Sequence, residues 1–104
     1  MSGGAVKELR ILAIAELNLE AQALGEAALA RDWEEARFRS VRINTLAFDL
    51  GSQRVAQVAR DITRALGAPG RQPAPGYGLK ISLLSKVIGQ LFENHLDAGS
   101  TPPT

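Results

Sequence analysis

The sequence predicts an all-α protein, an antiparallel up-and-down bundle of four helices. Strong helix formers fill most of the 104 residues, and glycine and proline are concentrated mostly between and beyond them. No segment has the pattern of a strand. Two of the three links between the helices are short, which is typical of antiparallel neighbours. We expect one domain over 5–98, with a flexible start at 1–4 and a disordered tail at 99–104.

The first predicted helix covers about 5–31 and is apolar on more than one side. One row faces a single direction and consists of Ile14, Leu17, Ala21, Leu24 and Ala28. A second row beside it consists of Leu9, Leu12, Ala15 and Leu19. A helix with two apolar rows is usually wedged between neighbours or used in assembly.

Capping residues delimit the second and third helices. Asp32, with Glu35 three residues later, resembles a capping box and starts a helix over about 32–50. Gly51 suits the left-handed position that ends a helix, and Ser52 caps a third helix over 53–66. The third helix has one apolar stripe, formed by Val55, Val58, Ala59, Ile62 and Leu66. Its other side is expected to face water and carries Arg54, Arg60, Asp61 and Arg64.

A loop rich in glycine and proline covers 68–78 and leads to a fourth helix at about 79–97. We expect the loop to be a spacer that returns the chain to the other end of the bundle, with Tyr77 packed against the core. Its length is near the upper end for a connection, so a functional role stays open. The inner side of the fourth helix consists of Ile81, Leu84, Val87, Ile88, Leu91 and Leu96.

Composition excludes several classes of function. Without cysteine, a disulfide scaffold, a thiolate metal site and a cysteine nucleophile are excluded. The single histidine, His95, leaves no room for a histidine-rich metal site. Twelve Lys and Arg against eleven Asp and Glu is too neutral a balance for a dedicated nucleic-acid binder. No targeting or membrane-spanning segment is evident, so we expect a cytoplasmic, non-catalytic protein with no cofactor and no metal.

The second predicted helix has an unusual second face. Its core face consists of Ala36, Ser40, Ile43, Ala47 and Leu50. The opposite side, where a surface helix normally carries charges, has Phe38, Val41, Thr45 and Phe48. Either the bundle buries this side against the long first helix, or it is an exposed apolar patch rimmed by arginine that binds a partner. The expected partner-binding face consists of Phe38, Val41, Arg42, Thr45 and Phe48, with Arg37 at its rim.

The segment Val41–Gly51 (VRINTLAFDLG) resembles a known family. Histidine-containing phosphotransfer (HPt) domains are four-helix bundles whose phospho-accepting histidine lies in the pattern His-x-Leu-Lys-Gly, followed by a small residue and Leu-Gly. The positions that match this spacing are Ile43, Ala47, Leu50 and Gly51. The resemblance extends over about 24–66, less than half of the chain, and it implies an HPt-like bundle.

Three departures from the HPt pattern remove its chemistry. Val41 is at the phospho-accepting position, Asn44 at the lysine position and Thr45 at the glycine position. Valine has no nucleophilic nitrogen and asparagine supplies no cation for a phosphoryl group. The resemblance therefore implies a pseudo-phosphotransfer protein of two-component signalling. Such a protein would dock a response-regulator receiver domain, or another signalling partner, through the outward face of the second helix.

Two other functions stay open. The first helix and the second face of the second helix could pair with copies of themselves in a homo-oligomeric structural or regulatory bundle, such as a homodimer. Thr45–Arg60, with Gly51 between two helices, superficially resembles a helix-turn-helix DNA-binding motif. However, Gln57 takes an expected apolar position of that motif, and residues 31–71 hold eight Arg against five Asp and Glu. Nucleic acid is therefore the less favoured partner.

Two further candidate sites are expected to be structural. His95 lies near the end of the fourth helix, where a histidine interacts favourably with the helix dipole. Glu16 and Glu20 are spaced to share one side of a helix. Because no histidine accompanies them, we expect two solvated glutamates and neither a metal site nor an acid–base pair.

Overall fold

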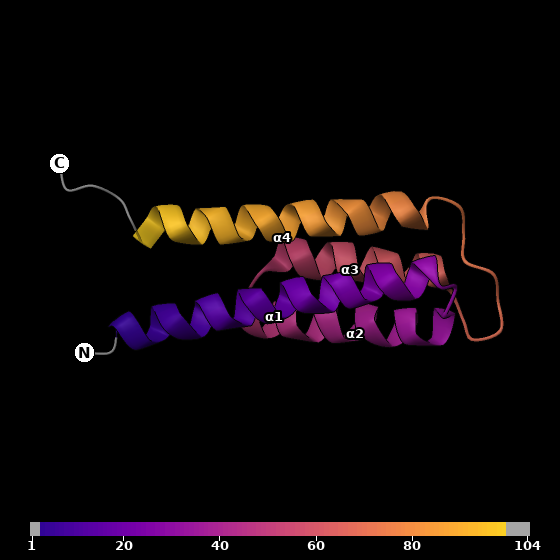
Figure 1. The fold of residues 1–104 in the computed structure, drawn as a ribbon, viewed down its shortest axis with the longest axis horizontal. Coiled ribbons are helices and arrows are strands. Elements are labelled where there is room, and N and C mark those ends of the chain that lie inside the picture. Colours follow the sequence, from indigo (N-terminus) through magenta and orange to yellow (C-terminus); the bar gives the residue numbers. More distant parts are fainter. Residues whose placement is uncertain (1–2, 100–104) are drawn as a thin grey trace.

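The computed structural model describes the backbone of residues 3–99 and the side chains of 8–95. Its regular structure consists of α1 (Gly3–Leu29), α2 (Trp33–Leu50), α3 (Gln53–Leu66) and α4 (Tyr77–Gly99) (Figure 1). The predicted all-α class with four helices is confirmed, and the described residues contain no strand. None of the four described helices is apolar over a stretch long enough to cross a membrane.

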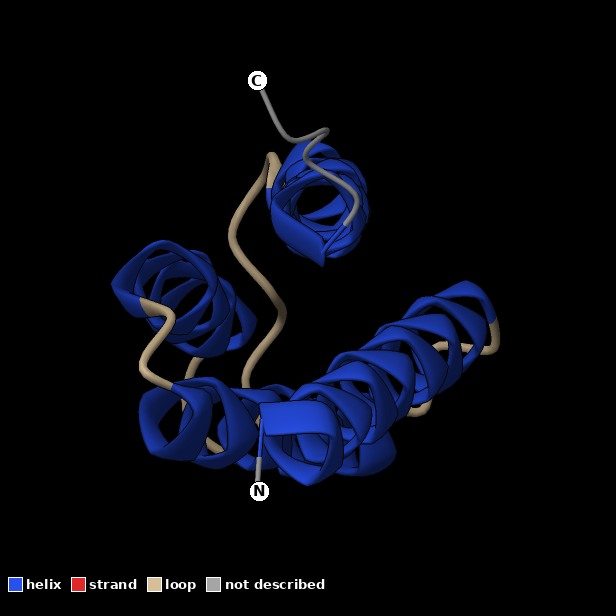
Figure 2. Cartoon of the chain, turned by 90° about the vertical axis from the view of Figure 1, so that its left-hand side faces the viewer, coloured by secondary structure: helices blue, strands red, loops and turns tan. Residues whose placement is uncertain are grey.

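The four helices form a ring in which each packs against two others. α1 contacts α2 and α4, and α3 also contacts α2 and α4, as the end-on view in Figure 2 shows. Along α1 and α2 the contacts run in opposite order, because Arg10 meets Leu50 and Glu20 meets Arg39. The two helices are therefore antiparallel, and α3 runs back alongside α2 (Figure 1).

The core lies between the inner sides of all four helices. Its largest fully buried apolar side chains are Ile14, Leu17, Leu24, Ile43, Val55, Ile62, Leu66, Leu84 and Ile88. Leu50 and Leu91 are only partly buried at its edge, and the side chain of Leu96 lies outside the described residues. The second apolar row of α1 is not wedged between neighbours, because Leu9, Leu12 and Leu19 are about two-thirds exposed.

The turns on either side of α2 use the same hydrogen-bond pattern. At its end, the amide of Gly51 donates to the carbonyl of Phe48 (3.0 Å), and Gly51 has the predicted left-handed backbone, with φ 84°. Before it, the amide of Arg31 donates to the carbonyl of Ala28 (3.1 Å). Arg31 has φ 58°, although it is not a glycine. This left-handed turn ends α1 at Leu29, two residues before the predicted end at 31.

The other predicted boundaries need small corrections. α1 begins at Gly3, so Gly3 and Gly4 are helical and not part of a flexible start, since no proline interrupts the run. α3 covers 53–66 as predicted. α4 begins at Tyr77, two residues before the predicted start, and the ring of Tyr77 packs edge-on against Trp33 with centroids 5.2 Å apart. At the other end Gly99 is still helical, and the rest of the predicted tail lies outside the described residues.

Candidate interaction surface

The outward side of α2 carries a group of apolar side chains that the bundle leaves exposed. We call Phe38, Val41, Thr45 and Phe48 the α2 outer face. Phe38 is 56% exposed, Val41 50% and Phe48 76%. Of the two explanations that the sequence left open, burial against the first helix is therefore wrong, and the exposed patch is what the structure contains.

The buried residues on the opposite side of α2 fix the rotation of this helix about its own axis. Ala36, Ser40, Ile43 and Ala47 are buried, so one complete face of the helix is committed to the core. Ser40 is satisfied there, because its hydroxyl donates to the carbonyl of Arg37 (2.9 Å) and accepts from the Thr63 hydroxyl (2.9 Å). The N-terminus of α2 is capped by Asp32, whose side chain accepts from the amide of Glu35 (3.2 Å).

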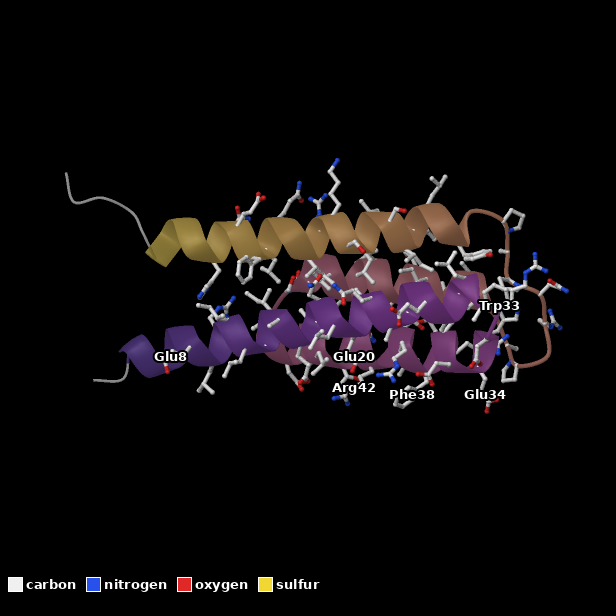
Figure 3. All side chains as sticks on the ribbon, in the orientation of Figure 1. Glu8, Glu20, Trp33, Glu34, Phe38 and Arg42 are labelled. Carbon is white, nitrogen blue, oxygen red and sulfur yellow. The ribbon has the colours of Figure 1, made fainter. Side chains whose placement is uncertain are left out.

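A buried carboxylate joins α1 to α2 beside the α2 outer face. Glu20 is only 8% exposed, and its two oxygens accept from Arg39 Nη1 and Arg42 Nε, both at 2.9 Å. Arg39 also donates to Glu35 (2.7 Å). Figure 3 labels Glu20 of α1 and Arg42 of α2 next to each other. The expectation that Glu20 is solvated is wrong, because two arginines of α2 draw it into the interface.

The charges of this cluster change the pKa of Glu20. Burial by itself raises the pKa of Glu20, but the hydrogen bonds and positive charges of Arg39 and Arg42 outweigh it and leave the pKa below its ordinary value. The pKa of Arg39 is raised in turn by its hydrogen bonds to Glu20 and Glu35. Glu20 and Arg39 are therefore both ionised at neutral pH.

The same cluster helps to position Phe38. The guanidinium carbon of Arg39 lies 5.4 Å from the centre of the Phe38 ring, a cation–π distance. Because Glu20 and Glu35 hold Arg39 in place, the ring is supported from its own helix while its other side faces solvent. The contact with Arg39 therefore restricts the position of the exposed Phe38 ring.

The two arginines predicted at this surface have different environments. Arg42 is half-exposed at the edge of the α2 outer face and reaches Glu16 as well as Glu20. Arg37 is not part of the rim, because its guanidinium is turned toward the end of α3. Its Nε donates to the carbonyl of Gly67 (2.8 Å), and its Nη2 donates to those of Ala68 (3.0 Å) and Arg71 (3.3 Å). Arg37 therefore caps α3 and fixes the start of the 68–78 loop.

The positions that correspond to the HPt pattern lie on or beside this surface. Val41, which the resemblance would place at the phospho-accepting position, is half-exposed on the α2 outer face. Thr45 donates its hydroxyl hydrogen to the carbonyl of Val41 (3.2 Å), and Asn44 accepts from Arg60 of α3 (3.5 Å). None of these three side chains can accept a phosphoryl group on nitrogen.

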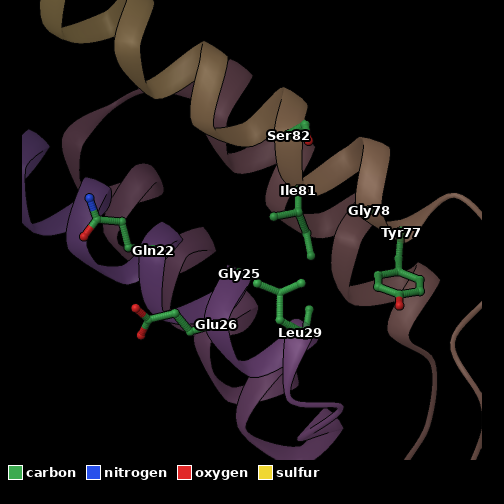
Figure 4. Close-up of a pocket in the computed structure, with 9 residues that line it drawn as sticks. Gln22, Gly25, Glu26, Leu29, Tyr77, Gly78, Ile81 and Ser82 are labelled. Carbon is green, nitrogen blue, oxygen red and sulfur yellow. The ribbon is translucent and has the colours of Figure 1, made fainter.

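Besides a groove of about 530 Å³ between α1 and α4, near Leu19 and Phe92, two more grooves of similar size lie beside the helices. One, of about 550 Å³, runs between α1 and α4, where Gly25 and Gly78 provide no side chains (Figure 4). Leu29 and Ile81 supply its apolar walls, and Glu26 lies at its margin. The other, of about 510 Å³, lies between the end of α2 and the start of α3, where Phe48 forms part of its lining.

The second groove contains residues that sequence reasoning placed only in water. Arg54 and Arg60 of α3 both line it, beside Phe48 of the α2 outer face. The periodicity of a single helix does not show which residues of a neighbouring helix lie beside it, so the sequence did not predict this groove. One signal was available, because Arg54 occupies the first turn of α3, where a cation is unfavourable and an acidic residue is preferred.

The described side chains contain no group of three or more histidines, aspartates and glutamates that could hold a metal ion. His95 is partly buried on α4. Neither a family model, nor a curated protein, nor a solved structure matches the chain. Two groups of exposed apolar side chains stand out among the described residues, the α2 outer face and the row Leu9, Leu12 and Leu19 of α1.

Proposed function

We propose that this protein is a non-catalytic interaction module that binds another protein through the α2 outer face. The observation that carries the proposal is the exposure of Phe38, Val41 and Phe48 on one side of a helix whose opposite side already forms the core. Exposed apolar patches of this kind mark interaction sites in soluble domains. Phe38 and Phe48 would supply rigid aromatic anchors, and Arg42 a charged margin.

The partner that we propose is a response-regulator receiver domain, in the cytoplasm. The support is the resemblance of the α2 segment to HPt domains, which meet receivers on the corresponding helix. With Val41 in place of the phospho-accepting histidine, docking would occur without phosphoryl transfer. The protein would then act by occupying the receiver, in competition with an active phosphotransfer protein.

The test is the affinity of the protein for each receiver domain encoded in the same genome. We expect at least one receiver to bind, and Phe48→Ser to weaken that binding by about tenfold or more, because one of the two aromatic anchors is lost. Leu79→Ser is the matched control, since Leu79 is 79% exposed on α4 and Phe48 is 76% exposed. It should leave the affinity unchanged.

Two results would contradict this proposal. If no receiver binds, the receiver is not the partner. If Phe48→Ser and Leu79→Ser weaken binding equally, the α2 outer face is not the docking surface. Circular dichroism on both variants establishes that the bundle remains folded, so a loss of binding cannot be mistaken for unfolding.

A homodimer is the second candidate, because α1 exposes a row of its own. Leu9, Leu12 and Leu19 are 66%, 65% and 64% exposed. Sedimentation velocity at micromolar concentration would show a dimer, and Leu12→Ser combined with Leu19→Ser would return it to a monomer. A wild-type monomer would remove this candidate and leave both apolar surfaces free for a different protein.

DNA binding gains no support from the geometry of α2 and α3. A helix-turn-helix motif sets its two helices at roughly 90–120°. Here α3 runs back along α2, and the pair is joined side by side through Ser40 with Thr63 and Asn44 with Arg60 (Figure 1). We therefore do not propose a nucleic-acid partner.

A further inference from the structure

The groove between α2 and α3 combines an apolar wall with positive charge. It has a volume of about 510 Å³. Phe48 and Ala56 contribute apolar surface from the two helices. The polar and glycine residues that complete it are Gly51, Gln53, Arg54, Gln57 and Arg60. No carboxylate is among these lining residues, so the groove has one sign of charge.

The two arginines of the groove differ from three of the other arginines of α2 and α3, while the fourth, Arg37, donates to backbone carbonyls at the end of α3. Among the described residues, Arg39, Arg42 and Arg64 each form an ion pair with a carboxylate. Arg54 and Arg60 form none with the carboxylates that the structure describes. Arg60 donates instead to two neutral amides, Gln57 Oε1 (2.8 Å) and Asn44 Oδ1 (3.5 Å). The positive charge of the groove is therefore available to a partner.

The place of Arg54 in the sequence also disfavours a purely structural role. It lies in the first turn of α3, whose dipole presents partial positive charge, and that turn contains no acidic residue. The first turn of α2, in contrast, contains Glu34 and Glu35. A cation at this position lowers the stability of the free protein slightly, because the helix dipole repels it. An anionic group that binds beside the cation offsets this repulsion.

We propose that this groove binds an acidic, amphipathic helical segment of a partner protein. An apolar side chain of the segment would pack on Phe48 and Ala56, while its carboxylates pair with Arg54 and Arg60. This inference rests on the proposed function and extends it, because Phe48 belongs both to the groove and to the α2 outer face. It adds that the partner's contact segment is acidic.

A nucleic acid fits the groove less well than an acidic protein segment does. Only two arginines line it, which is few for the phosphate contacts of a nucleic-acid site. The chain as a whole has a formal charge of only +1. The apolar wall, in contrast, suits an aliphatic or aromatic side chain.

The test uses a fluorescein-labelled synthetic peptide of about four helical turns, with glutamates on one side and leucine and phenylalanine on the other. A second peptide has every glutamate replaced by glutamine. We expect the acidic peptide to bind about tenfold more tightly than the neutral one at low salt, with the difference shrinking as salt is added. Arg54→Gln combined with Arg60→Gln should abolish that difference.

Arg64→Gln is the matched control variant. Arg64 lies on α3 outside the groove and pairs with Asp61 at 3.2 Å, so its loss should leave peptide affinity unchanged. Arg54→Gln alone should leave the thermal midpoint equal or higher, because it removes a cation from the first turn. Because Arg60 also donates to Asn44 of α2, the thermal midpoint of the double variant is measured as well, so that unfolding is not mistaken for reduced binding.

Equal affinity for the two peptides, or unaltered affinity in the double arginine variant, would overturn the inference. So would preferential binding of a single-stranded oligonucleotide. Phe38→Ser separates this inference from the proposed function, since Phe38 lies on the α2 outer face but outside the groove. If receiver binding depends on Phe38 and not on Arg54 or Arg60, the groove inference fails and the proposed function stands. If peptide binding depends on both arginines but no receiver binds, the proposed function fails and the groove inference stands.

Discussion

α2 and α3 are neighbours with similar inner sides and very different outer sides. Both bury one face in the same core, α2 with Ile43 and α3 with Ile62 at its centre. The outer side of α3 is polar and carries Gln57, Asp61 and Arg64, which hydrogen-bond to each other or to near neighbours. The outer side of α2 exposes Phe38, Val41 and Phe48. α3 demonstrates that a helix in this bundle needs no apolar residue on its outer side.

The apolar outer side of α2 is therefore unexplained by folding. Packing and capping requirements are met by its inner side, by Asp32 and by Gly51. Phe48 in particular contributes little to stability, because 76% of it stays exposed in the folded state. The proposed binding role of this surface would account for the difference between the two helices.

The largest expected changes in the free energy of unfolding come from substitutions on the inner sides of α2 and α3. Ile43→Ala and Ile62→Ala should each lower the free energy of unfolding by about 2–4 kcal/mol, because both side chains are fully buried and truncation leaves a cavity. Phe48→Ala should change it by less than about 0.5 kcal/mol, although it removes more atoms. Urea denaturation of the three variants measures this contrast. A loss of 2 kcal/mol or more for Phe48→Ala would make the outer side of α2 part of the core.

A smaller effect is expected from the buried charge that joins α2 to α1. Glu20→Ala should lower the free energy of unfolding by about 1–3 kcal/mol, since Arg39 and Arg42 lose a nearly buried partner. The pKa of Glu20 is lower in the folded state than its ordinary value of 4.5. The ionised carboxylate therefore contributes its full stabilisation at pH values above 4.5, and this stabilisation is lost as the pH falls toward the folded-state pKa. Unfolding measured between pH 7 and pH 3 should show a smaller acid-induced loss for the variant, and parallel curves would contradict this.

The smallest effect distinguishes the two turns that flank α2. Gly51 adopts its left-handed backbone without strain, whereas Arg31 adopts a similar one with a side chain. Arg31→Gly should therefore raise the free energy of unfolding by about 0.5–1 kcal/mol. Thermal or urea unfolding measures this shift. Destabilisation by Arg31→Gly would mean that the Arg31 side chain stabilises the turn more than its backbone strain costs.

Sequence periodicity predicted most of the fold, but it did not predict the side-chain environments that depend on contacts between two helices. The bounds of α3 and the left-handed Gly51 follow from local residue chemistry. Periodicity also grouped Phe38 with Phe48, but it could not say whether a neighbour covers them. The burial of Glu20 depends on arginines about twenty positions away, and Arg37 is held by the end of α3. Nothing near Arg31 in the sequence indicated a left-handed residue that is not glycine.

The most direct test of a binding role for the outer side of α2 is an amide chemical-shift titration of the isotopically labelled protein with the same receiver domains. We expect one receiver to shift the amides of Phe38, Val41 and Phe48, while those of Asp61 and Arg64 on the outer side of α3 stay in place. If no receiver shifts any amide on α2, or if the largest shifts lie on the outer side of α3, the account is contradicted.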